Sequence, residues 1–179
     1  TAENIIFVGD SAGANLITAV LIKCIEAGIP QPKGILTVYG LFLSNYATIP
    51  SRMLGLCDIF LTYSMTLRIF KTYAGHFKER LSKKEGKVPM ALHDEFDDEI
   101  SKSHLLSPIW SPDEVLRQFP KIRMLTTNLD PLLDENIEMA KKLRSRNVDV
   151  QLDIQHGLVH GFLHIIRVSN IPRIEFNIN

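Results

Sequence analysis

Residues 7–17 read F-V-G-D-S-A-G-A-N-L-I, and this stretch decides the fold. The apolar run at 5–8 that leads into it is short, continuous and rich in branched or aromatic residues, as in a buried strand. The residues that follow, 12–27, are numerous enough and suitably composed for a helix that ends at Gly28. The sequence therefore predicts a strand, a sharp turn and a helix around the pentapeptide G-D-S-A-G at 9–13.

Ser11 stands at the centre of that pentapeptide, between Gly9 and Gly13. A nucleophile elbow has this pattern: the serine occupies a strained turn, and the residues two before and two after it must lack bulk because strand and helix pass closely. The backbone N–H of Ala12, at the start of the helix, would then point at an oxyanion formed on a substrate. The alternative is an ordinary glycine-bordered turn in which Ser11 caps the helix. The position between a strand and a helix favours the elbow.

The rest of the chain alternates predicted strands and helices. Buried strands are expected at 34–39, 122–127 and 150–154, and helices at 64–73 and 131–147. Strands separated by helices predict an α/β fold with a mostly parallel sheet and helices on both of its faces. The charged stretch at about 77–103 has no apolar periodicity, which indicates a surface loop or a solvated linker.

Composition limits the classes of function. With 45% hydrophobic and 22% charged residues among 179, the chain can bury one sizeable core, and a single domain over 1–179 is expected. Lys plus Arg and Asp plus Glu both number 20, so no basic field favours a nucleic-acid partner. The longest apolar stretch, near 35–43, is far shorter than the roughly 20 residues that span a bilayer. No transmembrane segment is predicted, and any contact with lipid is expected at a surface.

A serine hydroxyl becomes a good nucleophile when a base removes its proton and an acidic group orients that base. In proteins with this elbow the chain order is Ser, then Asp or Glu, then His. Asp130 comes after the predicted strand at 122–127, and His160 comes after the one at 150–154. Because open parallel sheets bind their ligands at the carboxyl ends of the strands, the sequence predicts Ser11 as nucleophile, Asp130 as acid and His160 as base.

The acidic residues have other possible roles. Asp130 precedes a proline and could simply cap the following helix, while Asp134 and Glu135 could be ordinary partners of the helix dipole. Asp153 is a second candidate for the acid. Its place in the middle of a strand would point it at a face of the sheet instead of at the strand ends.

Three histidines recur at a spacing of four: His156, His160 and His164. On a helix they would align as possible metal ligands, but Gly157 and Gly161 argue against a helix there. No set of carboxylates accompanies them, so no metal site is predicted. We expect His156 and His164 to be loop or packing residues, and Gly161 to let the loop turn His160 toward the serine.

In this order, G-D-S-A-G-A-N, D-P-L-L-D-E and H-G-F resemble the hormone-sensitive lipase branch of the α/β-hydrolases. The segments at 49–64, 105–116 and 160–163 are similar to the animal members of that branch, and the resemblance extends over about 4–169. It implies the same triad, with hydrolysis of acylglycerols, cholesteryl esters and other lipid or small esters and without a cofactor or metal. It also implies a cytoplasmic protein that is recruited to lipid droplets.

The sequence departs from that branch in one important way. Its members carry an H-G-G-G-type loop upstream of the elbow that completes the oxyanion hole, and no Gly-Gly pair occurs in this chain. Ala12 is then the remaining donor. The resemblance further implies a partial catalytic domain whose sheet is incomplete on its N-terminal side, with an unpaired apolar edge and weak or absent activity.

Two other functions stay open. A non-catalytic ligand-binding protein of the same fold would keep the pocket and lack the base, and His160 argues for an enzyme. A carboxylesterase for small esters would use the same triad.

Overall fold

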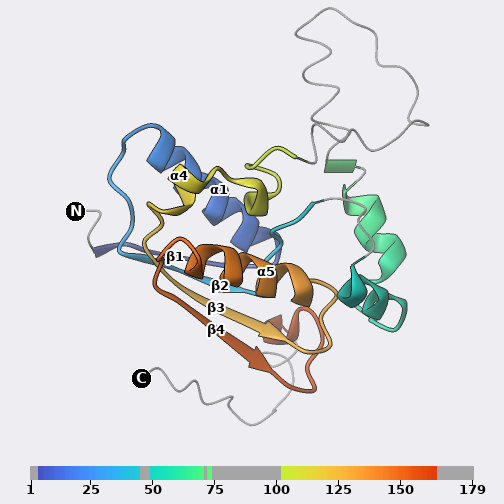
Figure 1. Cartoon of the computed structure of the whole chain (residues 1–179). Helices are drawn as coiled ribbons and strands as arrows, with labels where there is room; N and C mark the ends of the chain where they lie inside the picture. The colour runs from blue at the N-terminus through green and yellow to red at the C-terminus, as the bar shows by residue number, and fades with distance from the viewer. Residues whose placement is uncertain (1–3, 45–48, 71, 74–101, 165–179) are drawn as a thin grey trace, which may run out of the picture.

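The computed structural model describes residues 4–44, 49–70, 72–73 and 102–164 (Figure 1). Its centre is a parallel sheet whose strands lie in chain order, β1-β2-β3-β4. The strands are β1 (Ile6–Asp10), β2 (Gly34–Val38), β3 (Lys121–Thr127) and β4 (Val150–Gln155). Each overlaps a strand predicted from the sequence, and the α/β fold class is confirmed.

Three helices pack on one face of this sheet: α1 (Ala12–Glu26), α4 (Asp113–Leu116) and α5 (Leu133–Arg144) (Figure 1). The main core lies between them and the sheet. Ile122 and Met124 of β3 are buried there with side chains from all three helices. Helix α5 has an apolar stripe toward the core and a polar outer face, which explains why burial against the sheet holds it in place. It is shorter than the predicted helix at 131–147.

The other face of the sheet is covered differently. Near the carboxyl ends of the strands, Phe162 packs against Val38 and Leu125, and it belongs to the segment that follows β4. On β1, however, Ile6 and Val8 are 58% and 61% exposed. The prediction of a fully buried first strand is therefore wrong. Within the described residues β1 pairs with β2 alone, and of its side chains Phe7 is the one that packs against the helix-covered core.

The connections between these elements include the 3₁₀ helices η2 (Pro50–Leu56) and η3 (Pro108–Trp110). Residues 63–70 and 72–73 are helical, as expected for 64–73. The charged stretch at 77–103 lies almost wholly outside the described residues. Among the helices that the structure describes, none combines the length and the apolar character that crossing a bilayer requires.

The parallel arrangement brings the carboxyl ends of all four strands to one edge of the sheet. Ser11 directly follows β1 and Tyr39 directly follows β2. Asp130 lies shortly after β3, and His160 lies shortly after β4. This edge is where open parallel sheets place their ligands, and it holds every residue of the predicted triad.

Candidate active site

The turn at Ser11 is backbone-strained. Its φ of 52° and ψ of −121° lie outside the regions that residues with a side chain normally adopt, at a typical cost of about 1–3 kcal/mol. Hydrogen bonds hold the turn: Ser11 N–H donates to Val38 O at 2.9 Å, and Ser11 O accepts from Leu41 N–H at 3.3 Å. The side chain of Ser11 makes no capping hydrogen bond to α1. The strained backbone fits the elbow hypothesis, and no side-chain hydrogen bond supports the capping alternative.

The two glycines of the motif are not equivalent. A Cβ on Gly9 would lie 2.6 Å from the backbone C and O of Gly13, so the strand and the helix pass too closely there for any side chain. A Cβ on Gly13 would meet only Asp10 Oδ1 among the described residues, at 3.9 Å. The expected steric demand is therefore present at Gly9. It is not seen at Gly13, where a side chain would make only this one ordinary van der Waals contact.

The three residues of the predicted triad lie in one hydrogen-bonded chain. Ser11 Oγ is 2.9 Å from His160 Nε2, and His160 Nδ1 is 2.8 Å from Asp130 Oδ2. Asp130 is fully buried and His160 is 7% exposed, while Ser11 is partly open to solvent. The arrangement places an imidazole between a hydroxyl and a carboxylate, which is the order that proton removal from the hydroxyl requires.

Asp130 uses its two carboxylate oxygens for different tasks. Oδ1 accepts a hydrogen bond from Leu132 N–H at 2.7 Å, and Oδ2 faces the imidazole of His160. The Leu132 bond closes a local turn before α5, whose N-cap is Leu132 itself. Capping alone therefore does not account for Asp130.

The loop that carries His160 is shaped by its glycines and fixed by hydrogen bonds. Gly157 and Gly161 both have φ of +75°, a conformation that favours glycine and is incompatible with a continuous helix through the three histidines. Gly157 N–H donates to Asn128 Oδ1 at 2.8 Å, and Thr127 Oγ1 donates to Leu158 O at 2.7 Å. The loop after β4 is thus attached to the end of β3, close to Asp130.

The other candidate residues lie outside this chain of contacts. His156 and Asp153 are exposed, and Asp153 contacts Gln155 instead of an imidazole. His164 is also exposed, and its Nε2 lies 3.2 Å from Asp10 Oδ2. In the part of the chain that the structure describes, no group of three or more His, Cys, Asp or Glu side chains could hold a metal ion.

Ala12 begins α1 directly after the nucleophile candidate and is exposed. The N–H groups of a helix's first turn have no partner within the helix and carry a partial positive charge. The N–H of Ala12 is therefore suited to receive an oxyanion that forms beside Ser11.

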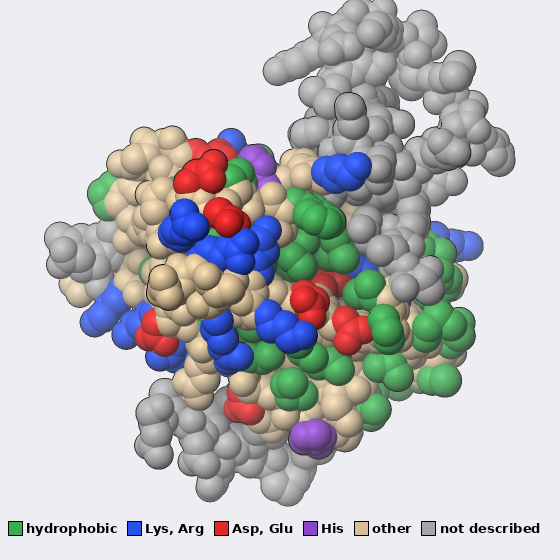
Figure 2. All heavy atoms as spheres, in the orientation of Figure 1, with side chains coloured by type: hydrophobic (Ala, Val, Ile, Leu, Met, Phe, Trp, Pro, Cys, Tyr) green, Lys and Arg blue, Asp and Glu red, His purple; other side chains and the backbone are tan. Residues whose placement is uncertain are grey.

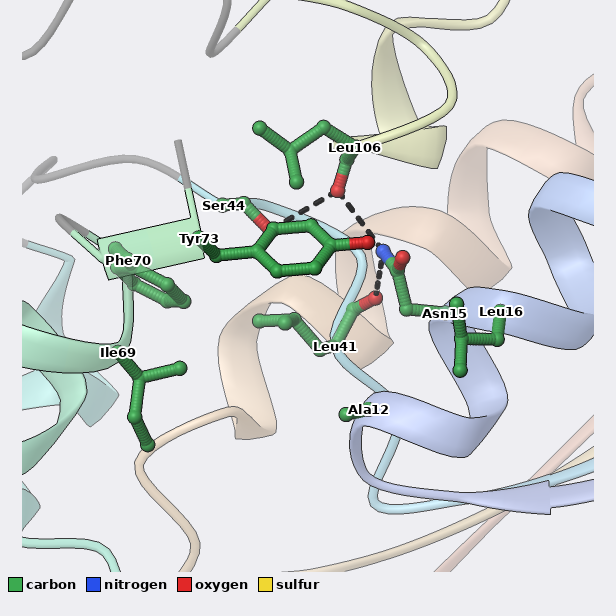
Figure 3. Close-up of a pocket in the computed structure, with 9 residues that line it drawn as sticks. All are labelled: Ala12, Asn15, Leu16, Leu41, Ser44, Ile69, Phe70, Tyr73 and Leu106. Atoms are coloured by element: carbon green, nitrogen blue, oxygen red, sulfur yellow. Dashed lines mark hydrogen bonds between the residues drawn. The ribbon is translucent and has the colours of Figure 1, made fainter. Parts of the chain in front are cut away.

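A pocket of about 100 Å³ opens next to Ala12 (Figure 3). Its walls come from α1, the chain after β2, the helix near 69–73 and the segment at Leu106, and they are almost wholly apolar. Asn15 supports these walls, since its Nδ2 donates to Leu41 O and to Leu106 O at 2.9 Å each. The lining residues are Ala12, Asn15, Leu16, Leu41, Ser44, Ile69, Phe70, Tyr73 and Leu106.

Sequence reasoning missed a buried polar cluster beside the triad. Glu135 is 1% exposed and forms an ion pair of 2.6 Å with Arg52, and its Oε1 accepts from the N–H groups of Phe42 and Leu43. Burial raises the pKa of Glu135, while the guanidinium and both N–H groups act in the opposite direction. Glu135 is thus more than a partner of the helix dipole, because it joins α5 to the chain after β2. Nothing in the local sequence distinguishes it from an ordinary first-turn glutamate.

Arg52 extends this cluster to the pocket. Its guanidinium lies over the ring of Phe70, 4.8 Å from the ring centroid, and Phe70 lines the pocket. The side chain is 3% exposed. We name the contacts of Arg52 and Glu135 with the residues after β2 the Arg52–Glu135 clamp.

Tyr39 is a further residue that sequence reasoning missed. Its ring is fully buried and lies against the ring of His160, with centroids 4.8 Å apart. The pKa of Tyr39 is raised by burial first and then by the charge and hydrogen bond of Asp10. The position of Tyr39 directly after β2, at the strand ends, is the signal that could have identified it.

Comparisons with known proteins agree with this architecture. The chain belongs to the alpha/beta hydrolase fold family, whose model matches residues 1–164. Human hormone-sensitive lipase is 30% identical over 89 residues, which make up 50% of this chain and 8% of the lipase. An esterase of Fusarium pseudograminearum is 25% identical over 165 residues, 92% of this chain and 44% of the esterase.

Two solved structures are similar in fold. Carboxyl esterase 2 of Tuber melanosporum has a TM-score of 0.74 at 21% sequence identity. The match covers 94% of this chain and 49% of the esterase chain. A thermostable esterase of Pseudomonas putida has a TM-score of 0.75 at 22% sequence identity. This match covers 94% of this chain and 46% of the esterase chain. The chain thus spans less than half the length of each of these relatives.

Proposed function

We propose that the protein is a serine carboxylic-ester hydrolase in which Ser11 is the nucleophile, His160 the general base and Asp130 the acid that orients it. The observation that carries this proposal is the unbroken contact from Ser11 Oγ to His160 at 2.9 Å and from His160 to Asp130 at 2.8 Å. The strained turn at Ser11 and the family membership support it.

The reaction proceeds by two acyl transfers. His160 Nε2 takes the proton of Ser11 Oγ as Oγ bonds to the ester carbonyl carbon, and the oxyanion that forms is stabilised by Ala12 N–H. The intermediate expels the alcohol, which receives the proton from His160, and leaves an acyl-serine. Water then attacks the acyl group with His160 again as base, the acid product leaves, and Ser11 Oγ regains its proton. Asp130 stabilises the imidazolium at each step.

Among the residues that the structure describes, Ala12 is the one candidate oxyanion donor that we assign. Loss of a single donor typically lowers turnover by about 10²–10³. We therefore expect this chain on its own to be a weak or inactive catalyst, and activity is measured on the full-length protein.

Two classes of ester fit different features of the chain. Lipid esters such as acylglycerols and cholesteryl esters are supported by the resemblance to animal hormone-sensitive lipase and by exposed apolar side chains between Met53 and Tyr73, of which Ile69 and Tyr73 line the pocket. The exposed side chains are Met53, Leu56, Ile59, Phe60, Met65, Ile69 and Tyr73. Apolar side chains also gather on the face of the molecule shown in Figure 2. Such a surface suits contact with a lipid droplet from the cytoplasm.

Small esters are supported by the pocket itself. Its volume of about 100 Å³ is below the roughly 300–1,000 Å³ typical of sites for drug-sized ligands, so a short acyl or alkyl group fits it best. The similar proteins that are named esterases support this class too.

The nucleophile is tested with a fluorophosphonate probe, which phosphonylates an activated serine. We expect labelling of the wild type and none of Ser11→Ala, with a loss of ester hydrolysis of about 10⁶-fold. Ser145→Ala, at an exposed serine on the far end of α5, is the matched control and should be labelled normally. Equal hydrolysis by Ser11→Ala and wild type would exclude Ser11 as nucleophile. Ester binding without turnover by the wild type would favour the non-catalytic alternative.

The ester class is tested with p-nitrophenyl esters of two to sixteen carbons in solution and with emulsified triacylglycerol, measured side by side. Turnover that rises sharply at the emulsion surface supports the lipid class. A preference for acyl groups of two to four carbons, without such a rise, supports the small-ester class.

A further inference from the structure

Asp10, the last residue of β1, joins three parts of the site through one oxygen. Its Oδ2 accepts a hydrogen bond from the hydroxyl of Tyr39 at 3.3 Å and lies 3.2 Å from His164 Nε2. Asp10 directly precedes Ser11, Tyr39 follows β2, and His164 lies in the turn after His160. The carboxylate therefore connects the strand of the nucleophile candidate with the loop of the base candidate.

Tyr39 is the residue through which this connection reaches the base. Its ring meets the ring of His160 at 4.8 Å and an interplanar angle of 57°, and it meets Phe162 edge-on at 5.2 Å. Asp130 holds one edge of the imidazole, at Nδ1, while the Tyr39 ring limits its tilt from the side. A hydrogen bond at the far end of the Tyr39 ring keeps that surface in place.

The backbone of Tyr39 is strained, although packing an aromatic side chain in a core does not require strain. Its φ of 37° is unusual for an aromatic residue, and its N–H donates to Leu125 O at 2.6 Å. Strained backbone of this kind concentrates at functional sites, where the surrounding structure holds it. Ser11 also has a positive φ, of 52°, and its N–H donates a hydrogen bond to the carbonyl of Val38, the residue before Tyr39.

We propose that Tyr39 is a positioning residue for the general base, and that Asp10 acts through it by holding the Tyr39 hydroxyl. The proposal rests on the function proposed above. Burial and the nearby carboxylate of Asp10 raise the pKa of Tyr39, so its hydroxyl keeps the proton that it donates. The contact of Asp10 with His164 matters less, since His164 is 76% exposed and exposed ion pairs contribute little.

The test uses Tyr39→Phe, which keeps the ring against His160 and removes the hydroxyl. We expect the fluorophosphonate labelling rate and kcat on a soluble ester to fall about two- to tenfold with KM nearly unchanged, as for loss of one hydrogen bond. Because the Tyr39 hydroxyl also accepts from the backbone N–H of Leu163, Asp10→Ala should give a fall no larger than that of Tyr39→Phe, and the double variant should fall no further than Tyr39→Phe alone. Asp10→Asn keeps an oxygen that accepts from Tyr39 and should recover most of the rate. Tyr63→Phe, outside these contacts, is the matched control.

Each outcome separates this inference from the proposed function. If Tyr39→Phe and Asp10→Ala react as fast as wild type while Ser11 is still labelled, the positioning role is wrong and the hydrolase proposal stands. If the wild type is not labelled at all, the hydrolase proposal itself fails. If the two effects add in the double variant, Asp10 does not act through Tyr39. Melting curves of every variant identify any loss of folding, and a fall in rate that Asp10→Asn does not reverse would also overturn the proposal.

Discussion

Asp130 and Glu135 lie in the same short segment, D-P-L-L-D-E, and both carboxylates are almost completely buried, yet their surroundings differ. Asp130 faces the imidazole of His160, beyond which lies the partly open Ser11. Glu135 faces the guanidinium of Arg52 and two backbone N–H groups inside the clamp. One carboxylate contacts an imidazole, which can accept and return a proton during catalysis, and the other contacts a guanidinium, which stays charged.

The difference teaches that burial alone does not identify a catalytic carboxylate. A buried acid can assist proton transfer only if its partner changes charge during the reaction, as an imidazole does. A carboxylate paired with arginine faces a partner whose charge does not change, so its effect is on the fold. Substitutions around Asp130 should therefore change mainly activity, and substitutions around Glu135 should change mainly stability.

The largest effect is expected on the activity side. Asp130→Asn keeps the shape and the oxygen that accepts from Leu132 N–H, but it loses the charge that orients and stabilises the imidazole. We expect ester turnover to fall about 10⁴-fold, measured as kcat with a soluble ester. The free energy of unfolding in urea should change by no more than about 1 kcal/mol.

Asp153→Asn is the matched control, because Asp153 is an exposed strand carboxylate and was the second candidate for the acid. It should leave turnover unchanged. Loss of turnover in Asp153→Asn, with normal turnover in Asp130→Asn, would exchange the two assignments.

The next effect is on the stability side. Arg52→Met removes the guanidinium and leaves the Glu135 charge buried without its ion-pair partner, so we expect a loss of about 3–5 kcal/mol in urea unfolding. Adding Glu135→Gln should recover about 1–3 kcal/mol, since the amide oxygen can still accept from both N–H groups and no buried charge remains. The labelling rate of the folded variants should change far less than in Asp130→Asn. If the double variant instead loses the sum of the stabilities that Arg52→Met and Glu135→Gln lose separately, the two residues do not act as a unit.

The sequence was sufficient for those features that depend on a residue's place along the chain. Ser11, Asp130 and His160 each follow a strand, so the strand pattern and the order of residue types placed them at one edge. Their catalytic roles stay predictions. The elbow at Ser11 was readable because G-D-S-A-G is itself the turn, although the demand for glycine proved to lie at Gly9.

The features that the sequence did not reveal depend on contacts between distant segments. Arg52 and Glu135 meet because η2 packs against α5, and a glutamate in the first turn of a helix already has a sufficient local explanation. The exposure of Ile6 and Val8 depends on which elements cover that face of the sheet, and an apolar run carries no such information. Tyr39 reads locally as the end of an ordinary strand, so its place at the strand ends was its sole sequence signal, and the contact with His160 was not predictable.

The smallest effect is expected at Asp134, the third carboxylate of the same segment. Its Oδ2 accepts from Ser51 N–H at 2.7 Å, and it lies only partly buried and without a contact to His160 or Arg52 in the described structure. Asp134→Ala should cost about 0.5–1.5 kcal/mol in urea unfolding, the contribution of one ordinary hydrogen bond, and leave turnover unchanged. Asp134→Asn keeps the accepting oxygen and should cost less. If Asp134→Ala destabilises as much as Arg52→Met, the stability of this region comes from the whole first turn of α5 and not from the buried ion pair. That result would mean that Glu135 does not differ from Asp134 in its effect on stability. The difference between Glu135, which affects stability, and Asp130, which affects activity, would remain.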